Sequence, residues 1–229
     1  MEKVQAARQM YAYPSNSQTD RLIPSRYVPG SEMEWSMWTT IAGWDFAESF
    51  SQNAAFQTDL PLNWSVADYD FETMPYETGF MEDIYSVGNA DLSIFRGRGG
   101  KIIHYQGWAD GNVAPEWNLH YYKKVVSLSN LTDVQDFYRF FMYPGMAHID
   151  VGDNYTTAWR CDYYEYLEKW YFDDEAPETL LTTRWNLTTD AAIDYRPQFP
   201  WPLTSRWMGI GKPTADEADI AKWVGVETS

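Results

Sequence analysis

Two short stretches of the sequence, each following an apolar run, end in one side chain suited to acid–base chemistry. Asp110 closes GWAD after the run KIIHYQ at 101–106, and His148 closes PGMAH after DFYRFFMY at 136–143. A carboxylate hydrogen-bonded to one imidazole nitrogen fixes the tautomer, so the other nitrogen takes a proton from a hydroxyl nucleophile and returns it to a leaving group. Asp110 and His148 are therefore a candidate acid and base of an acyl-transfer triad.

The segments around these two residues predict the elements that would bring them together. Residues 101–172 read as strand, helix, strand, helix. Pro115 begins the first helix, EWNLHYYKKVVSL, SNLTDVQ is a linker, and AWRCDYYEYLEKWYFD is the second helix. A right-handed helical crossover makes the two strands parallel, which places the loops after both strands at one edge of the sheet. We therefore expect Asp110 and His148 to meet, although they lie 38 positions apart.

The first hundred residues are less regular. Residues 12–34, rich in Pro, Ser and Gly, predict a loop or an irregular hairpin, and helical patterns follow at about 44–56 and 78–87. The stretch NADLSIFRGRGG predicts a short helix that begins near Asp91 and stops at the Gly pair.

Composition restricts the class of protein. The 229 residues carry a net charge of −16 but are 45% hydrophobic and 17% aromatic, which indicates a globular chain. The negative charge disfavours nucleic acid and anionic membranes as partners, and no apolar run approaches the roughly 20 residues that span a bilayer. Cys161 is the only cysteine, so the chain has neither an internal disulfide nor a cysteine metal cluster. Four Asn-x-Ser/Thr sequons hint at secretion; they begin at Asn63, Asn130, Asn154 and Asn186.

Other interpretations compete with the acid–base pair. An Asp in a Gly-rich turn is often a turn former, and a loop His is often only exposed. His148, Asp150 and Asp153 do not have the spacing of a recognised metal site. His104 and His120 are expected to be structural or exposed, and Trp108 to line the site or to pack. The aromatic residues of 35–85 suggest a platform for stacking sugars or phenolic rings, which is the binding-module alternative.

Several stretches of the chain resemble one family of hydrolases. GGKIIHYQGWAD, the helix containing HYY, DFYRFFMYPGMAH and EKWYFDDEAPETLL are similar to the C-terminal part of the tannase and feruloyl esterase family, as are YVPGSEMEW and DLSIFRGRGG. The resemblance covers about residues 10–200. It implies that Asp110 is the triad acid and His148 the triad base of a secreted serine hydrolase that cleaves aromatic carboxylic esters.

The chain also departs from the family pattern. No G-x-S-x-G nucleophile motif occurs, and IYSVGN at 84–89 lacks the leading Gly. Ile149 stands where the family usually has a disulfide-bonded Cys, and Gln106 stands where a His is common. The calcium loop typical of the family's lid has no counterpart either, so no cofactor is expected in this chain.

Together these patterns predict an α/β chain, a partial α/β-hydrolase fold with a parallel sheet and the remnant of a lid domain. Residues 1–88 are expected to be the lid remnant and 89–229 the C-terminal part of the catalytic domain. The expected function is hydrolysis of a small aromatic ester, with the Ser supplied by an upstream segment or chain, outside the cell. The alternative is an inactive binding protein that keeps the fold.

Overall fold

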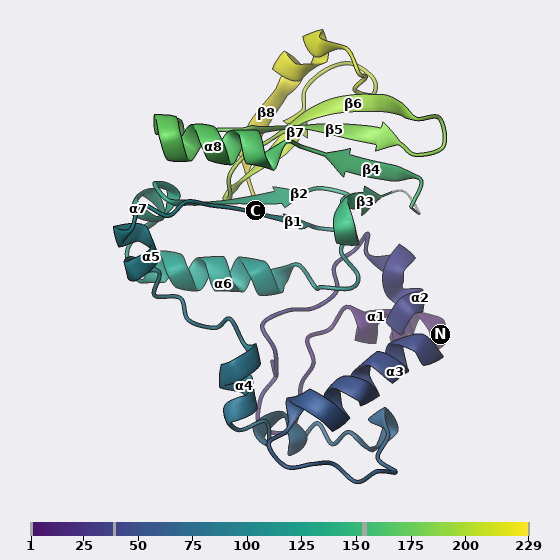
Figure 1. Ribbon diagram of the computed structural model, residues 1–229. Coiled ribbons are helices and arrows are strands. Elements are labelled where there is room, and N and C mark those ends of the chain that lie inside the picture. The colour runs from purple at the N-terminus through teal and green to yellow at the C-terminus, as the bar shows by residue number, and fades with distance from the viewer. Residues whose placement is uncertain (1, 39, 153–154, 229) are drawn as a thin grey trace. The chain divides into compact units, whose positions relative to one another are not determined.

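The computed structural model describes residues 2–38, 40–152 and 155–228. The chain forms two compact units (Figure 1), and each is described by itself. Unit 1 consists of Met1–Asn89 and Gly111–His120, and unit 2 of Ala90–Asp110 and Tyr121–Ser229. The assignment of residues 1–88 to a lid remnant and of 89–229 to a catalytic domain stays a prediction.

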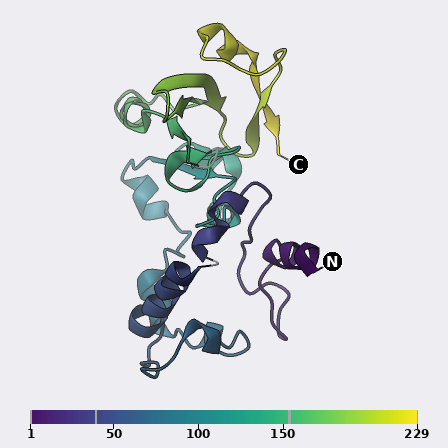
Figure 2. The same ribbon diagram turned by 90° about the vertical axis from the view of Figure 1, so that its right-hand side faces the viewer.

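Unit 1 contains helices and loops but no strand among its described residues (Figures 1 and 2). The expected loop over 12–34 is irregular until a short 3-10 turn, and the two expected helical patches are confirmed as α3 with its π-helical extension and as α4. The elements are α1 (Glu2–Met10), η1 (Glu32–Glu34), α2 (Trp35–Trp38), α3 (Ile41–Phe50), η2 (Ser51–Ala55), η3 (Val66–Asp68), η4 (Met74–Tyr76) and α4 (Phe80–Tyr85).

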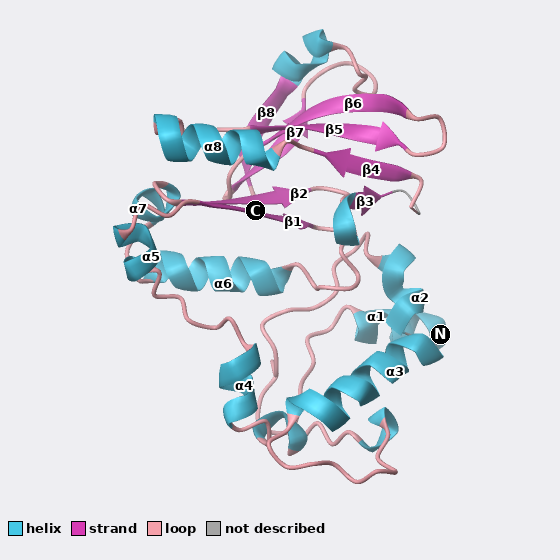
Figure 3. Cartoon of the chain, in the orientation of Figure 1, coloured by secondary structure: helices cyan, strands magenta, loops and turns pink. Residues whose placement is uncertain are grey.

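Unit 2 holds all the strands of the described chain (Figure 3). Its helices are α5 (Ser93–Gly97), α6 (Glu116–Ser127, whose first residues belong to unit 1), α7 (Leu131–Gln135), α8 (Tyr163–Asp173) and the 3-10 turns η5 (His148–Asp150) and η6 (Glu217–Lys222). Its strands are β1 (Ile102–Gly107), β2 (Tyr138–Tyr143), β3 (Val151–Gly152), β4 (Thr157–Arg160), β5 (Leu180–Asn186), β6 (Ala191–Gln198), β7 (Leu203–Trp207) and β8 (Trp223–Glu227).

Strands β1 and β2 are parallel, as the sequence predicts. Their register runs from Ile102 opposite Tyr138 to Gly107 opposite Tyr143, and helix α6 connects them. The crossover therefore brings the loops after both strands to the same edge of this two-stranded sheet.

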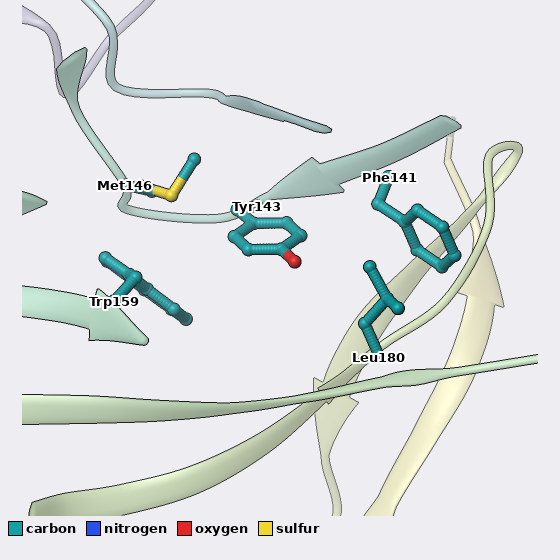
Figure 4. Packing of buried hydrophobic residues seen from close by; sticks show 5 residues of the cluster. All are labelled: Phe141, Tyr143, Met146, Trp159 and Leu180. Carbon is teal, nitrogen blue, oxygen red and sulfur yellow. The ribbon is translucent and has the colours of Figure 1, made fainter. Parts of the chain in front are cut away.

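Both faces of β2 are buried, which explains its unbroken aromatic sequence. On one face Tyr138 and Phe140 contact Tyr122 of α6, with ring centroids 4.9 and 5.3 Å apart. On the other face a buried cluster fills the space between β2 and the antiparallel sheet (Figure 4); its members are Phe141, Tyr143, Met146, Trp159 and Leu180. Because side chains alternate along a strand, β2 contributes to two hydrophobic cores, one on each face of the sheet.

Two sequence expectations for this region are wrong. The linker SNLTDVQ contains helix α7, because the Asn130 side chain caps it by accepting from the backbone N–H of Asp133 at 2.9 Å. The helix expected from Ala158 starts only at Tyr163, where Asp162 is its N-cap. Residues 157–160 instead form β4, because pairing with β5 buries Trp159.

Antiparallel pairs make up the rest of unit 2. Strands β3, β4, β5 and β6 form one sheet in that order, and β7 pairs with β8. Pro200 bridges to Phe141, and the N–H of Trp201 donates to the carbonyl of Phe140, so this segment covers one side of β2. No helix in the described part of the chain is long and apolar enough to cross a bilayer.

Candidate active site

The loops that follow β1 and β2 are hydrogen-bonded to each other through their backbones. The N–H of Trp108 donates to the carbonyl of Tyr143 at 3.0 Å, and the N–H of Ala109 donates to that of Met146 at 2.9 Å. Ala109, Met146 and Ala147 are all buried. The positions of the two loops are therefore set by main-chain contacts close to both candidate residues.

Gly107 permits this close approach. A Cβ atom at residue 107 would lie 2.1 Å from the carbonyl oxygen of Met146, far inside van der Waals contact. Only a residue without a side chain fits at the end of β1 while the base loop packs against it.

The structure brings the two predicted residues together. His148 Nδ1 donates to Asp110 Oδ2 at 3.1 Å, and the same oxygen accepts from Gln106 Nε2 at 2.8 Å. Asp110 is only 4% exposed, and the His148 side chain is 36% exposed. A buried carboxylate is thus held between an amide and an imidazole, and part of that imidazole faces solvent.

This geometry assigns different roles to the two imidazole nitrogens. In neutral His148 the contact with a carboxylate makes Nδ1 the protonated nitrogen, and Nε2 is then the proton acceptor. A group that reaches Nε2 therefore meets an imidazole whose orientation is fixed by the bond from Nδ1 to Asp110. The arrangement can accept a proton from a hydroxyl and stabilise the resulting imidazolium.

The other two histidines belong to β1 and α6. His104 on β1 is largely buried, its Nδ1 is 2.6 Å from the hydroxyl of Tyr138, and desolvation lowers its pKa to about 4. His120 is half-buried in the unit 1 part of α6. Trp108 is half-buried after β1.

Two polar side chains have contacts that the sequence did not predict. Gln106, noted only as a departure from the family pattern, is the second donor to Asp110. Within unit 1, buried Glu34 accepts from the backbone N–H of Gly111 at 2.8 Å and from Asn112 Nδ2 at 3.3 Å. Glu34 lies in the stretch YVPGSEMEW, which carries part of the resemblance, but a buried Glu that holds a distant loop has no local sequence signature.

No group of three or more His, Cys, Asp or Glu side chains is arranged to hold a metal ion among the residues that the structure describes. Asp153, considered above with His148 and Asp150, lies outside the described residues.

Comparison with known proteins identifies relatives that are named as esterases. The family model described as tannase and feruloyl esterase matches residues 2–220. A probable feruloyl esterase B-1 from Aspergillus oryzae is 27% identical over 210 residues, which cover 84% of this chain and 37% of that protein. An uncharacterized esterase from Agrobacterium fabrum is 34% identical over 165 residues, covering 71% of this chain and 28% of the relative.

The solved structures agree with the sequence relatives. The crystal structure of feruloyl esterase B from Aspergillus oryzae superimposes with a TM-score of 0.78 and 25% identity, covering 98% of this chain and 45% of that one. The chain thus spans less than half of the length of each of these three proteins. Because the family model matches nearly the whole sequence, the chain belongs to the tannase and feruloyl esterase family.

Proposed function

We propose that this chain supplies the acid and the base of a serine-type carboxylic ester hydrolase. The observation that carries the proposal is the contact of His148 Nδ1 with the buried carboxylate of Asp110 at the carboxyl ends of two parallel strands. Membership of a family whose relatives are named as esterases supports the same reaction class.

In the proposed reaction His148 Nε2 takes the proton of a Ser hydroxyl while the Ser oxygen bonds to the ester carbonyl carbon. The tetrahedral intermediate then collapses, and the alcohol leaves with the proton from the imidazolium. Water repeats the sequence on the acyl-enzyme, releasing the acid and restoring the Ser. Asp110 keeps its hydrogen bond to Nδ1 and stabilises the imidazolium.

The nucleophile comes from outside these 229 residues in this proposal, because no G-x-S-x-G segment occurs in the sequence. An upstream segment or a second chain would carry the Ser and the backbone donors of the oxyanion hole. Residues 1–88 would be what remains of a lid, and the substrate would be an aromatic ester such as those cleaved by the feruloyl esterases. The exposed sequon residues Asn63 and Asn130 favour an extracellular location.

A chimera tests this proposal directly. Residues 1–229 replace the matching region of Aspergillus oryzae feruloyl esterase B, whose remaining part would supply the nucleophile under this proposal. We expect the chimera to hydrolyse methyl ferulate and expect the 229-residue chain alone to show no turnover above background. In the chimera, His148→Ala and Asp110→Asn should each lower kcat by roughly 10³-fold or more, because the triad acts as a unit.

His120→Gln is the matched control, since His120 belongs to unit 1 whereas Asp110 and His148 belong to unit 2. Its kcat should stay near that of the parent chimera. An active chimera whose turnover survives His148→Ala would refute the proposal. Turnover by the isolated chain that His148→Ala abolishes would refute the external source of the nucleophile.

One observation favours a second candidate, a binding protein without catalysis. Unit 1 contains a cavity of about 570 Å³ with aromatic side chains in its wall, among them Tyr13, Tyr27 and Trp117. Such walls suit a flat aromatic ring. Calorimetry with ferulate should show binding that Trp117→Ala weakens and that His148→Ala leaves unchanged if this candidate is correct.

A further inference from the structure

The turn that follows His148 has a backbone that its residues rarely adopt. Ile149 has φ 51° and ψ 46°, and Asp150 has φ 61°, so two consecutive residues other than glycine are left-handed. This conformation is costly for a β-branched residue, on the order of 1–3 kcal/mol. The Ile149 side chain is 75% exposed and gains little from packing, so other contacts must hold the turn.

Tyr105 provides such a contact from the neighbouring strand. Its hydroxyl donates to Asp150 Oδ2 at 3.3 Å. The Tyr105 ring lies parallel to that of Tyr163, with centroids 4.2 Å apart and planes 3° apart, and it stacks at 5.6 Å on Tyr143. The donor is therefore fixed in direction before it meets the carboxylate.

Main-chain bonds close the turn on its far side. The N–H of Ala147 donates to the carbonyl of Val151 at 2.7 Å, and Val151 pairs with Ala158 of β4. These bonds fix the two ends of the turn. The Tyr105 hydroxyl binds between these two ends, at Asp150.

The groups around Asp150 make its carboxylate a suitable acceptor. Burial raises its pKa, while the hydrogen bond from Tyr105 and the charge of His148 lower it. Cys161 and Tyr163 also face it, and burial raises the pKa of both, that of Cys161 to about 12. At neutral pH these two neighbours carry no charge, so the hydrogen bond from Tyr105 is the contact that favours the ionised Asp150 beside a neutral His148.

We propose that Tyr105 and Asp150 are positioning residues for the base. Their hydrogen bond holds the left-handed turn at 149–150 and so keeps His148 Nδ1 on Asp110. This inference rests on the proposed function, because it concerns the same base, but its test needs no turnover.

The test uses the full 229-residue chain labelled with ¹⁵N in its three histidines. At pH 8 the two nitrogens of each imidazole report the tautomer, and a low-field Nδ1 proton reports the bond from His148 to Asp110. Histidine substitutions assign the three signals. We expect wild-type His148 to show Nδ1 protonated, Nε2 unprotonated and the low-field proton.

Four variants separate the hydrogen bond from the backbone. Tyr105→Phe keeps the stacked ring but removes the donor, and Asp150→Gly permits the left-handed backbone but removes the acceptor. Both should lose the low-field proton and show mixed tautomers. Asp150→Asn tolerates the same backbone and retains an acceptor, so it should keep the wild-type pattern. Tyr166→Phe is the matched control, because it removes a hydroxyl that accepts from the backbone N–H of Leu181 and not from the turn at 149–150.

Retention of the wild-type pattern in both Tyr105→Phe and Asp150→Gly would overturn the inference. The signals of His104, which is largely desolvated in β1, report whether each variant is folded. If Asp150→Gly changes the His104 signals, the inference is tested by Tyr105→Phe against Tyr166→Phe alone: only Tyr105→Phe should lose the low-field proton. Asp110→Asn tests the proposed function separately: if it leaves the His148 pattern unchanged, the acid–base pair itself is refuted, whatever Tyr105 does.

Discussion

His104 shows how burial changes the chemistry of a single residue. Its ring lies 4.5 Å from that of Phe140 and stacks on Tyr138, whose hydroxyl it contacts. Desolvation disfavours the imidazolium and lowers the pKa to about 4 from an ordinary value of 6.5. The folded chain therefore resists protonation at a site that the unfolded chain protonates readily.

The consequence for stability has a definite sign. Between pH 6.5 and pH 4 the unfolded state binds the proton and the folded state does not, so acid destabilises the fold. With about 1.4 kcal/mol for each pKa unit, His104 should contribute up to about 3 kcal/mol to this loss. His104→Gln, which can still bond to Tyr138, should lose that much less stability than the wild type between pH 7 and pH 4 in urea titrations. Equal losses in the two proteins would contradict the prediction.

The sequence predicts the two central residues of the site but not their supports. Asp110 and His148 each follow an apolar strand, and chain topology then requires them to be neighbours. Tyr105 and Gln106 look like ordinary strand residues, since their roles depend on which face of β1 they occupy. The left-handed turn at Ile149 has no sequence signal, because a β-branched residue there argues against it.

At the scale of elements, the approach of the two loops depends on Gly107. We expect Gly107→Ala to lower the free energy of unfolding by about 1–3 kcal/mol, because its Cβ would collide with the backbone of Met146. Gly97→Ala is the matched control: it lies in α5, and its Cβ would meet nothing within 4 Å. Urea denaturation should show this control unchanged or slightly more stable, as alanine favours helix. Similar losses of unfolding free energy in both variants would show that contact with the Met146 backbone is not the cause.

A buried ion cluster joins strands β5 and β6. Asp194 is fully buried, and its Oδ2 accepts from Arg184 Nη2 at 2.7 Å and from Nε at 3.0 Å. Arg196 Nη2 lies 3.7 Å from Asp194 Oδ1, and its Nη1 donates to the carbonyl of Pro144, in the loop that leads to His148. The antiparallel sheet is thereby connected to the base loop.

Removing the central charge should be costly. Asp194→Asn leaves two guanidinium groups without their carboxylate and should lower the free energy of unfolding by roughly 3 kcal/mol. Glu178→Gln breaks the ion pair with Arg139, but Glu178 is 82% exposed, so the expected loss is below about 1 kcal/mol. Thermal denaturation measures the stability of both variants. If Asp194→Asn is as stable as Glu178→Gln, the ion cluster does not stabilise the fold as proposed.

The elements predicted from sequence are those specified by local patterns. Strand, helix and strand over 101–143 have clear apolar periodicity and a Pro at the helix start. The sequence predicts a helix from residue 158 because Trp and Arg fit either state, and only pairing with β5 makes residues 158–160 part of strand β4. Strands β5–β8 were not predicted, because burial alternates only in part along strands such as β5 and β6, which leaves little period-two pattern in the sequence.

At the scale of the whole molecule, net charge and exposed apolar surface act in opposite directions. Tyr164, Tyr171 and Phe172 are exposed on α8, beside a cavity of about 310 Å³ that Phe95 and Leu167 also line. Such a patch favours association, whereas a charge of −16 makes copies repel.

Salt should therefore promote self-association of the isolated chain, because it screens the repulsion and leaves the apolar attraction. We expect sedimentation velocity to show larger species in high salt than in low salt. The variant Tyr164→Gln/Phe172→Gln should reduce them, while Leu62→Gln, which removes an exposed side chain from unit 1, should not. Larger species in low salt would contradict this balance.

The N–H of Ala109 donates to the carbonyl of Met146, so hydrogen exchange at Ala109 reports on the loop that carries His148. Deuterium can replace the amide hydrogen of Ala109 only when that bond opens. The rate of deuterium uptake at Ala109 therefore measures how often the two loops separate. A ligand that steadies the histidine side of the site would be visible as slower labelling at residue 109, without any probe placed on the histidine itself.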